Sequence, residues 1–190
     1  MNIRGIILAG GLSSRMGKNK LQLELKGKPI INLVIDNARA SNLSELLLVY
    51  GKYEVETEIK KVYNPNYELG MSTSIIEGLK GYFGDGVMLL LGDMPFVDKD
   101  IINELVQGFI DTEKNIVVPV LEGKRGNPVI VGKKYFQSLL ENKGDKGARD
   151  IINNNADDVE WVQVKSRGIF IDVDEEAIYK CIVNSKIENC

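Results

Sequence analysis

Short apolar runs alternate along this chain with longer segments in which apolar residues recur every three or four positions. A run at residues 3–8 precedes a helical pattern that opens at Pro29, and the fully apolar run at 87–91 precedes one that Asp98 can cap. Strands that alternate with helices predict right-handed crossovers and a sheet covered by helices on both faces. The sequence therefore predicts an α/β fold with three layers, α/β/α, around a mostly parallel sheet.

The same patterns place the other elements and suggest the number of domains. Further strands are expected at 46–50, 61–63, 116–119, 129–131, 159–164 and 169–171, and further helices at 72–82, 133–141, 148–154 and from about residue 175. No repeat, low-complexity segment or Pro/Gly/Ser-rich linker divides the 190 residues. Since this length suits one domain, we expect a single domain over residues 1–190.

The charge and the apolar pattern make several classes of partner unexpected. Lys and Arg together number 24 and Asp and Glu 27, which gives a net charge of −3 without any basic cluster. A nucleic-acid-binding stripe is therefore not expected. No unbroken apolar run approaches the ~18 residues that a membrane-spanning helix needs. We expect no nucleic acid and no membrane as partner, and a monomer by default, because no exposed apolar run is evident.

The chain contains no histidine and only two cysteines, Cys181 and Cys190. The missing histidine excludes triads, general bases and metal sites built on imidazole, and the cysteine spacing excludes a thiolate zinc site. We expect both cysteines to be reduced thiols, as is usual in a cytoplasmic protein. Any chemistry must therefore use carboxylates, Lys, Arg, backbone amides and an oxygen-liganded metal.

The loop after the first expected strand reads Leu-Ala-Gly-Gly-Leu-Ser-Ser-Arg-Met-Gly-Lys-Asn-Lys at residues 8–20, a composition that suits phosphate binding. Gly10 and Gly11 allow the backbone to approach a ligand closely, and successive amides in such a turn can bind an anion. Arg15 offers a planar fork for phosphate oxygens, and Lys20 offers a point charge. The spacing is not that of a P-loop, and an ordinary surface loop of small residues is the open alternative.

Acidic residues follow two more of the expected strands. Asp93 comes after the run at 87–91, and in an open α/β sheet the loops after neighbouring strands meet at the ligand-binding edge. Mg²⁺ takes one or two carboxylates together with substrate phosphate oxygens. Asp172 and Asp174 are two positions apart, so a strand would place both on one side. Two simpler roles stay open: Asp93 could belong to a turn before Pro95, and Asp174 could cap the following helix.

The loop at 8–20 resembles the signature of nucleotidyltransferases, which join a nucleoside triphosphate to a phosphorylated acceptor. Within that group the chain resembles the molybdenum cofactor cytidylyltransferase family. The resemblance rests on the segments NPNYELGMSTSI at 64–75, LGDMP at 91–95, RGNPV at 125–129, GDKGAR at 144–149 and DVD at 172–174. These segments occur in the family's order and cover nearly the whole chain.

The resemblance implies a Rossmann-like nucleotidyltransferase fold and a Mg²⁺-dependent enzyme. The implied reaction moves a nucleoside monophosphate, CMP from CTP, onto molybdopterin or the molybdenum cofactor and releases pyrophosphate. A molybdoenzyme could then receive the modified cofactor. In this reaction the acceptor's own phosphate attacks the nucleotide, so the chain needs no general base.

The resemblance also implies the residues of the site. Those expected to bind the nucleotide are Leu8, Ala9, Gly10, Gly11, Ser13, Arg15, Lys20, Gly70, Ser72 and Asp93. Three of them, Arg15, Lys20 and Asp93, are expected to act in catalysis. The expected acceptor contacts are Gly126, Asn127, Pro128, Gly147, Ala148 and Arg149. Asp93 and Asp174 would hold Mg²⁺, with Asp172 as the second choice for the latter.

Three departures from the family pattern leave the substrate open. Asn127 stands where the family usually has His, and Glu-Glu-Ala follows Asp174 where Thr-Pro-Glu is common. Gly10 stands where cytidylyl members often carry Ala and guanylyl members often carry Gly. GTP therefore stays possible as the donor, and a different phosphorylated compound, such as a sugar phosphate, stays possible as the acceptor. A non-catalytic protein that binds or inserts the cofactor is the competing hypothesis from a different functional class.

Overall fold

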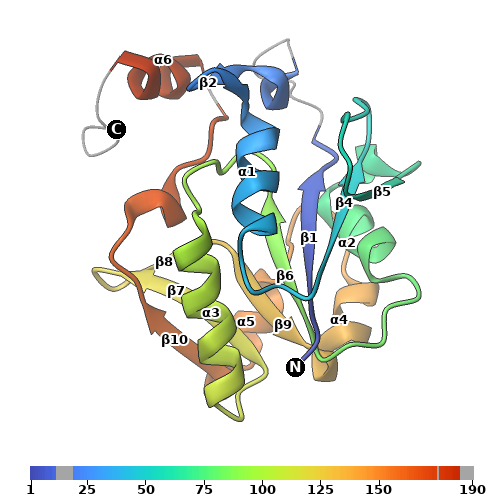
Figure 1. The fold of residues 1–190 in the computed structure, drawn as a ribbon. Coiled ribbons are helices and arrows are strands. Elements are labelled where there is room, and N and C mark those ends of the chain that lie inside the picture. Colours follow the sequence, from blue (N-terminus) through green and yellow to red (C-terminus); the bar gives the residue numbers. More distant parts are fainter. Residues whose placement is uncertain (12–18, 175, 185–190) are drawn as a thin grey trace.

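The computed structural model describes residues 1–11, 19–174 and 176–184. The described strands form an eight-stranded sheet in the order β10-β7-β9-β6-β1-β4-β5, with β8 paired to β7, and a separate β2–β3 pair. The strands are β1 (Ile3–Ala9), β2 (Glu24–Leu25), β3 (Lys28–Pro29), β4 (Glu45–Tyr50), β5 (Lys60–Tyr63), β6 (Gly86–Leu91), β7 (Ile116–Leu121), β8 (Lys124–Arg125), β9 (Val129–Gly132) and β10 (Val159–Gln163). Figure 1 shows β1 and β6 at the centre of the sheet.

The helices follow the strands much as the sequence patterns predict. They are α1 (Ile30–Arg39), α2 (Met71–Leu79), α3 (Lys99–Asp111), α4 (Phe136–Glu141), α5 (Arg149–Asn154) and α6 (Glu176–Asn184). Short 3-10 turns lie at η1 (Lys20–Gln22), η2 (Tyr67–Leu69), η3 (Lys133–Tyr135), η4 (Ala156–Asp158) and η5 (Arg167–Phe170). Asp98 caps α3 as predicted, because its side chain accepts hydrogen bonds from the amides of Asp100 and Ile101.

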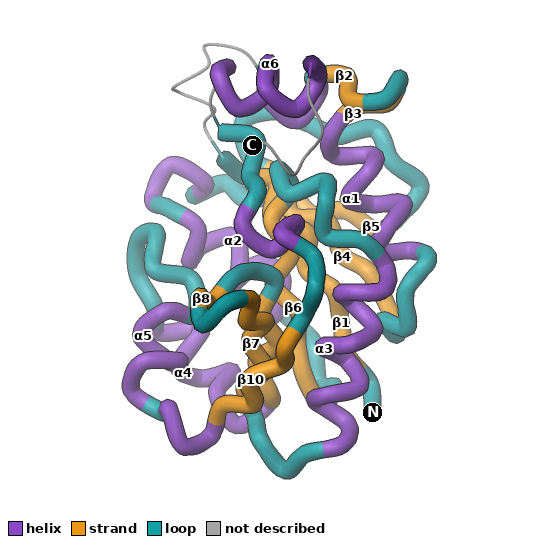
Figure 2. Tube along the Cα trace, turned by 90° about the vertical axis from the view of Figure 1, so that its left-hand side faces the viewer, coloured by secondary structure: helices purple, strands orange, loops and turns teal. Residues whose placement is uncertain are grey.

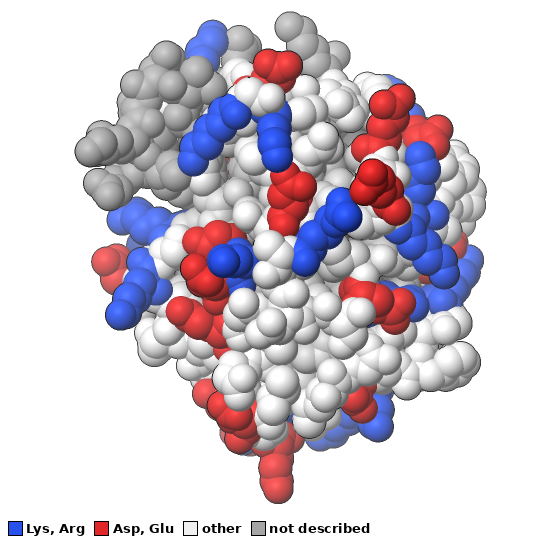
Figure 3. All heavy atoms as spheres, in the orientation of Figure 1, with Lys and Arg blue, Asp and Glu red and all other residues white. Residues whose placement is uncertain are grey.

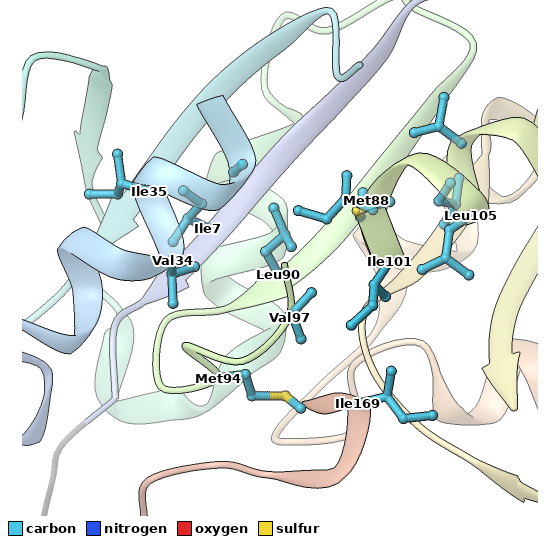
Figure 4. Packing of buried hydrophobic residues seen from close by; sticks show 14 of the residues in the cluster. Ile7, Val34, Ile35, Met88, Leu90, Met94, Val97, Ile101, Leu105 and Ile169 are labelled. Atoms are coloured by element: carbon cyan, nitrogen blue, oxygen red, sulfur yellow. The ribbon is translucent and has the colours of Figure 1, made fainter. Parts of the chain in front are cut away.

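Alternate side chains of the central strands enter two separate hydrophobic clusters. On β1, Ile3 and Ile7 pack with apolar residues of α1 and α3, whereas Ile6 and Leu8 pack with those of α2, α4 and α5. Figure 4 shows the first cluster, in which Ile7 lies near α1. Figure 2 shows the result, with strands between one layer of helices that holds α1 and α3 and another that holds α2, α4 and α5. The predicted three-layer α/β/α fold is confirmed.

The sheet is mostly parallel, as predicted, with an antiparallel part that the sequence patterns did not predict. β1 pairs in parallel with β4 and with β6, and β7 pairs in parallel with β10. β9 runs antiparallel to both of its neighbours, β6 and β7. The direction of β9 relative to β7 follows from the short segment that connects them. A parallel crossover needs a dozen or more residues, whereas only the short β8 hairpin separates β7 from β9.

The strand predicted at 169–171 is absent from the structure. Residues 167–170 form the 3-10 turn η5 instead, and the side chain of Ser166 accepts a hydrogen bond from the amide of Gly168 at its start. Ile169 is buried in the cluster against α1 and α3. An apolar triplet suits a buried turn as well as a buried strand, so periodicity alone could not separate the two.

Cys181 on α6 is disulfide-bonded, and the described residues contain no free cysteine. The prediction of a reduced thiol is therefore wrong at Cys181. The count and spacing of cysteines could not reveal this, because pairing depends on which sulfur atoms the folded chain brings together. Cys190 lies outside the described residues.

The described residues carry charges of both signs at the surface, and the longest described helix, α3, has 13 residues. Figure 3 shows Lys and Arg side chains interspersed with Asp and Glu over one face, where the described residues form no continuous basic stripe. Within the described ranges, no helix has both the length and the apolar character needed to span a membrane.

Candidate active site

A cleft of about 640 Å³ opens at the carboxyl ends of β1 and β6. Leu8 at the end of β1 pairs with Leu91 at the end of β6, so the loops that follow these strands begin side by side. The residues that line the cleft come from both loops and from three further segments, at 67–74, 145–149 and 172–174. They are Leu8, Gly10, Gly11, Lys20, Leu21, Tyr67, Glu68, Gly70, Met71, Ser74, Leu91, Asp93, Asp145, Arg149, Asp172 and Asp174. Gly10, Gly11 and Lys20, which belong to the described part of the loop at 8–20, therefore face the same space as the acidic residues.

The centre of the cleft wall is a lysine held by two carboxylates. The ammonium nitrogen of Lys20 lies 2.5 Å from Oδ2 of Asp93 and 2.6 Å from Oδ1 of Asp174. Lys20 is only 9% exposed. Burial alone would lower the pKa of Lys20, but the neighbouring carboxylates outweigh it and raise that pKa above its ordinary value. Lys20 is therefore a permanent cation.

Backbone hydrogen bonds bring these distant carboxylates together. The amide of Gly92 donates to the carbonyl of Leu8 at 3.1 Å, which holds the start of the Asp93 loop against β1. The amide of Val173 donates to the carbonyl of Asp93 at 2.9 Å, which fixes the acidic segment 172–174 beside that loop.

The side chain of Val173 anchors the same segment. It is fully buried in a small cluster with Leu25 and Ile30. Its neighbours Asp172 and Asp174 both line the cleft, as the period-two argument predicted, although no strand forms there.

Asp172 and Asp174 differ in their surroundings. Asp174 accepts a hydrogen bond from the Lys20 ammonium, whose described hydrogen bonds go to Asp93 and Asp174. Burial raises the pKa of Asp172, and the negative charge of Asp93 raises it further. The contact of Asp174 with the same ammonium that Asp93 binds favours Asp174 as the partner of Asp93 for a cation.

The donor set fits a magnesium ion that arrives with a phosphate ligand. Asp93 and Asp174 already converge on one positive charge. Among the described residues there is no group of three or more His, Cys, Asp or Glu side chains suited to a metal ion. A closed cage is therefore absent from that part of the chain, but Mg²⁺ usually takes only one or two carboxylates and completes its shell with water and substrate phosphate.

The opposite wall of the cleft is the start of α2. Gly70 has φ +105, a conformation that L side chains rarely adopt, and a Cβ there would meet the backbone of Gly144 at 2.6 Å. The amide of Met71 donates to Oδ1 of Asp145 at 2.9 Å, and the amide of Ser72 donates to the carbonyl of Gly144 at 3.0 Å. The segment 144–149 therefore caps α2 and lies against the turn at Gly70.

A buried asparagine orders the segment before α2. Asn64 is completely buried and donates to Oγ1 of Thr73 at 2.8 Å and to Oγ of Ser74 at 3.0 Å. Ser74 lines the cleft, and a Cβ on Gly10 would lie 2.7 Å from its Oγ. Glycine at position 10 thus lets β1 approach α2 closely.

The structure brings most, but not all, of the predicted site residues into the cleft. The residues predicted to bind nucleotide that line it are Leu8, Gly10, Gly11, Lys20, Gly70 and Asp93. Ala9 and Ser72 are buried and do not line it. Ser13 and Arg15 lie outside the described residues.

Of the predicted acceptor contacts, only Arg149 lines the cleft. Ala148 packs in the core against α2 and α4, and a Cβ on Gly126 would meet Ile169 at 2.6 Å. The amide of Asn127 donates to the carbonyl of Ile169, and the carbonyl of Gly147 accepts from Asn142. Pro128 does not line the cleft either.

Several residues of the cleft are missing from the predicted site residues, and three of them, Tyr67, Ser74 and Asp145, make hydrogen bonds or close contacts described above or carry an aromatic ring. Tyr67 and Ser74 lie inside the segment 64–75 that carried the resemblance, and Asp145 lies inside 144–149. The signal was therefore present in the motifs, but only the fold reveals which of their side chains face the ligand.

Comparison with known proteins assigns the chain to a family. The family described as the MobA-like NTP transferase domain matches residues 5–159. The chain belongs to this family. Members of the MobA-like NTP transferase family are nucleotidyltransferases, so the resemblance stated from the motifs is confirmed, and so is the type of enzyme.

The relatives of this chain include proteins named as cytidylyltransferases and proteins named as guanylyltransferases. The molybdenum cofactor cytidylyltransferase of Escherichia coli is 27% identical over 177 residues, 89% of each chain. A probable molybdenum cofactor guanylyltransferase of Natranaerobius thermophilus is 31% identical over 128 residues, 64% of this chain and 62% of that relative. The second match thus spans less than two thirds of its relative's length.

Solved structures support the Rossmann-like fold of the MobA-like family. The crystal structure of Rv0371c from Mycobacterium tuberculosis H37Rv superimposes with a TM-score of 0.83 at 22% identity, over 97% of this chain and 98% of that one. This likeness concerns the fold.

Proposed function

We propose that this nucleotidyltransferase moves CMP from CTP onto the phosphate of a molybdopterin-type acceptor and releases pyrophosphate, with Mg²⁺ as its cofactor. The observation that carries the proposal is that Asp93 and Asp174 both contact the ammonium of Lys20, in a cleft that Gly10 and Gly11 also line. A protein that only bound the cofactor would not need two carboxylates around one cation next to a loop of phosphate-binding composition, such as the loop at 8–20.

The proposed chemistry suits a chain without histidine. A terminal phosphate on the acceptor is largely ionised at neutral pH, since the second pKa of a phosphate ester is about 6. It can attack the α-phosphorus of the triphosphate directly, and pyrophosphate leaves. The protein must then position two anions and neutralise their charge, and it needs no general base.

Each part of the cleft has a task in this proposal. Asp93 and Asp174 would hold Mg²⁺, with Asp172 as the second choice, and the bound ion supplies Lewis-acid neutralisation of phosphate charge. Lys20 and Arg15 neutralise the triphosphate oxygens. Gly10 and Gly11 allow backbone amides to approach them.

Among the residues predicted to contact the acceptor, Arg149 is the charged one, and it lines the cleft. Arg149 begins α5 and lines the cleft, and it has no ion-pair partner among the described residues. We infer that its guanidinium binds the acceptor's phosphate. Gly126, Asn127, Pro128, Gly147 and Ala148 would shape the acceptor side through their backbone.

Guanylyl transfer is the second candidate, and Gly10 favours it. Because a methyl group at this position would press on Ser74 Oγ, glycine leaves that wall of the cleft open, which suits a larger purine base. The guanylyltransferase relative at 31% identity points the same way.

A nucleotide and acceptor panel tests the proposal. CTP, GTP, ATP and UTP are each offered with metal-free molybdopterin, molybdenum-loaded molybdopterin or a sugar phosphate, and pyrophosphate release is measured. We expect release with CTP and a molybdopterin, whereas GTP as the better donor would select guanylyl transfer. Tight nucleotide binding without release on any acceptor would overturn the proposal in favour of a non-catalytic cofactor-binding or insertion protein.

We place the reaction in the cytoplasm, where nucleoside triphosphates are available, and propose that a monomer delivers its product to a molybdoenzyme. Size-exclusion chromatography with light scattering tests the monomer.

A further inference from the structure

Lys20 occupies the position that a divalent cation would need. Its ammonium is flanked by Asp93 at 2.5 Å and Asp174 at 2.6 Å, and both carboxylates are partly buried. Two carboxylates that close together repel each other unless a cation lies between them. The chain supplies that cation from residue 20, far from both acidic residues in the sequence.

We propose that the ammonium of Lys20 takes the place of the divalent cation while the cleft is empty. It then holds Asp93 and Asp174 in the geometry that binds the metal. When substrate arrives, the ammonium moves to the triphosphate and the metal takes its position. This inference rests on the proposed function and adds a mechanism that couples metal binding to nucleotide binding. It assigns Lys20 a second role besides charge neutralisation of the phosphates.

The coupling follows from the charges in the cleft. The ammonium and a divalent cation cannot both lie between the same two oxygens, so metal alone must displace Lys20 from its contacts with Asp93 and Asp174. A triphosphate changes this balance, because its oxygens give the displaced ammonium a new anionic partner. Metal and nucleotide should therefore each tighten the binding of the other, by a factor that linkage makes equal in both directions.

The local backbone allows such a movement. Asn19 caps the turn η1 by accepting a hydrogen bond from the amide of Leu21, and the side chain of Leu21 is buried in the core. The backbone at Lys20 is thus fixed from one side, while its four-carbon side chain can rotate within the cleft that it lines.

A metal titration without nucleotide tests the inference. Mn²⁺, which also takes oxygen ligands, is titrated by electron paramagnetic resonance into the wild type and into Lys20→Met, which keeps the length and removes the charge. We expect Lys20→Met to bind Mn²⁺ at least about tenfold more tightly, since the competing ammonium is gone. The matched control is Lys28→Met, which removes a lysine from an exposed pair with Asp36 and should change the affinity by less than about twofold.

A second titration includes α,β-methylene CTP, which cannot release pyrophosphate. In the wild type the analogue should tighten Mn²⁺ binding about tenfold or more, and in Lys20→Met this enhancement should shrink. Equal or weaker Mn²⁺ affinity of Lys20→Met in the absence of nucleotide would overturn the inference. The metal-only result does not depend on turnover, so it can stand even if the acceptor panel overturns the proposed function.

The wild type provides a test that does not depend on the fold of the variant. With ¹³C-labelled lysine side chains, the Lys20 signal, assigned by its loss in Lys20→Arg, should shift when Mg²⁺ and the analogue are added together. The Lys28 signal should stay in place. An unchanged Lys20 signal at saturation would show that its ammonium does not move, and the inference would fail.

Discussion

At the scale of single residues, the cleft is organised around the ammonium of Lys20 and the two carboxylates that it contacts, those of Asp93 and Asp174. Asp93 is the one of these three residues that follows a central strand, since β6 ends at Leu91. Its carbonyl also accepts the hydrogen bond that holds the acidic segment in place, and a side-chain substitution leaves that backbone contact intact.

Asp93→Asn should therefore abolish turnover while the protein stays folded. We expect pyrophosphate release to fall by about 10³-fold or more, because charge stabilisation of this kind is usually the largest catalytic contribution. Asp100→Asn, which changes an exposed carboxylate at the start of α3, is the control and should keep wild-type activity. Wild-type rates in Asp93→Asn would contradict the role of Asp93.

The contact between Gly10 and Ser74 makes a prediction about stability. Gly10→Ala should lower the free energy of unfolding by about 1–3 kcal/mol, because its methyl group would lie 2.7 Å from Ser74 Oγ. Gly11→Ala is the matched control, since its methyl group meets no described atom within 4 Å.

The double variant Gly10→Ala/Ser74→Ala separates this contact from unrelated effects of the two substitutions. It should lose less stability than the two single variants together, by about 1 kcal/mol, in urea unfolding. Strict additivity would show that the contact does not limit the approach of β1 to α2.

Residue types made Lys20, Asp93 and the pair Asp172 and Asp174 candidates for phosphate and metal binding, and the family resemblance then implied that Lys20, Asp93 and Asp174 belong to one site. The direct contact of Lys20 with both carboxylates could not be predicted. It depends on side-chain positions across three distant segments, which neither spacing nor composition records.

At the scale of elements, the cap on α2 connects the two walls of the cleft. The carboxylate of Asp145 accepts from the first amide of α2, where a negative charge also interacts favourably with the helix dipole. Because the same segment carries Arg149 into the cleft, the cap positions the acceptor side relative to the nucleotide side.

Asp145→Ala should cost about 1 kcal/mol of stability, as lost helix caps do, and should raise the KM for nucleotide more than it lowers kcat. Asp145→Asn retains a capping oxygen and should behave closer to the wild type. Asp150→Ala, which removes an exposed carboxylate paired with Lys146, is the control. A variant Asp145→Ala with unchanged stability and KM would contradict the proposed position of this segment.

Asp158 on η4 links three elements and gives stability a pH dependence. Burial tends to raise the pKa of Asp158, but hydrogen bonds from Lys134, Tyr135 and Asn115 outweigh burial and lower that pKa well below its ordinary value. A carboxyl whose pKa is lower in the folded state stabilises the protein above its unfolded pKa of about 3.9, and this stability is lost as the pH falls below that value.

Acidification from pH 6 to pH 3 should therefore destabilise the wild type more than Asp158→Asn, measured as the urea midpoint at each pH. The neighbouring variant Asp157→Asn should follow the wild type. Identical acid profiles for the wild type and Asp158→Asn would rule out this contribution.

Element patterns predicted the central strands and the helices that cover them, because strands buried on both faces read as continuous apolar runs. They failed at η5 and at the direction of β9. The first looks like a strand by composition, and the second depends on the length of a connection rather than on the strand itself.

At the scale of the whole molecule, the substrate should act as a stabilising ligand. Mg²⁺ with CTP at one hundred times the Kd should add about 2.7 kcal/mol to the free energy of unfolding. For a chain of this size that corresponds to a rise in Tm of roughly 5–10 °C. A chelator should remove most of the shift, and CMP in place of CTP should give a smaller one. A full shift that persists in the chelator would contradict a metal-dependent triphosphate site.

The hydrogen bond from Val173 to Asp93 has a consequence for how the enzyme comes into being. One half of the proposed cation site is synthesised with Asp93 and the other half about 80 residues later, with the segment 172–174. The two halves are joined only when the later segment docks on the earlier one. A ribosome-bound nascent chain that has not yet released this segment can already contain β1, β6 and the glycine loop, yet it lacks half of the ion's ligands. The proposed cation site therefore forms only after the segment around residue 174 has left the exit tunnel.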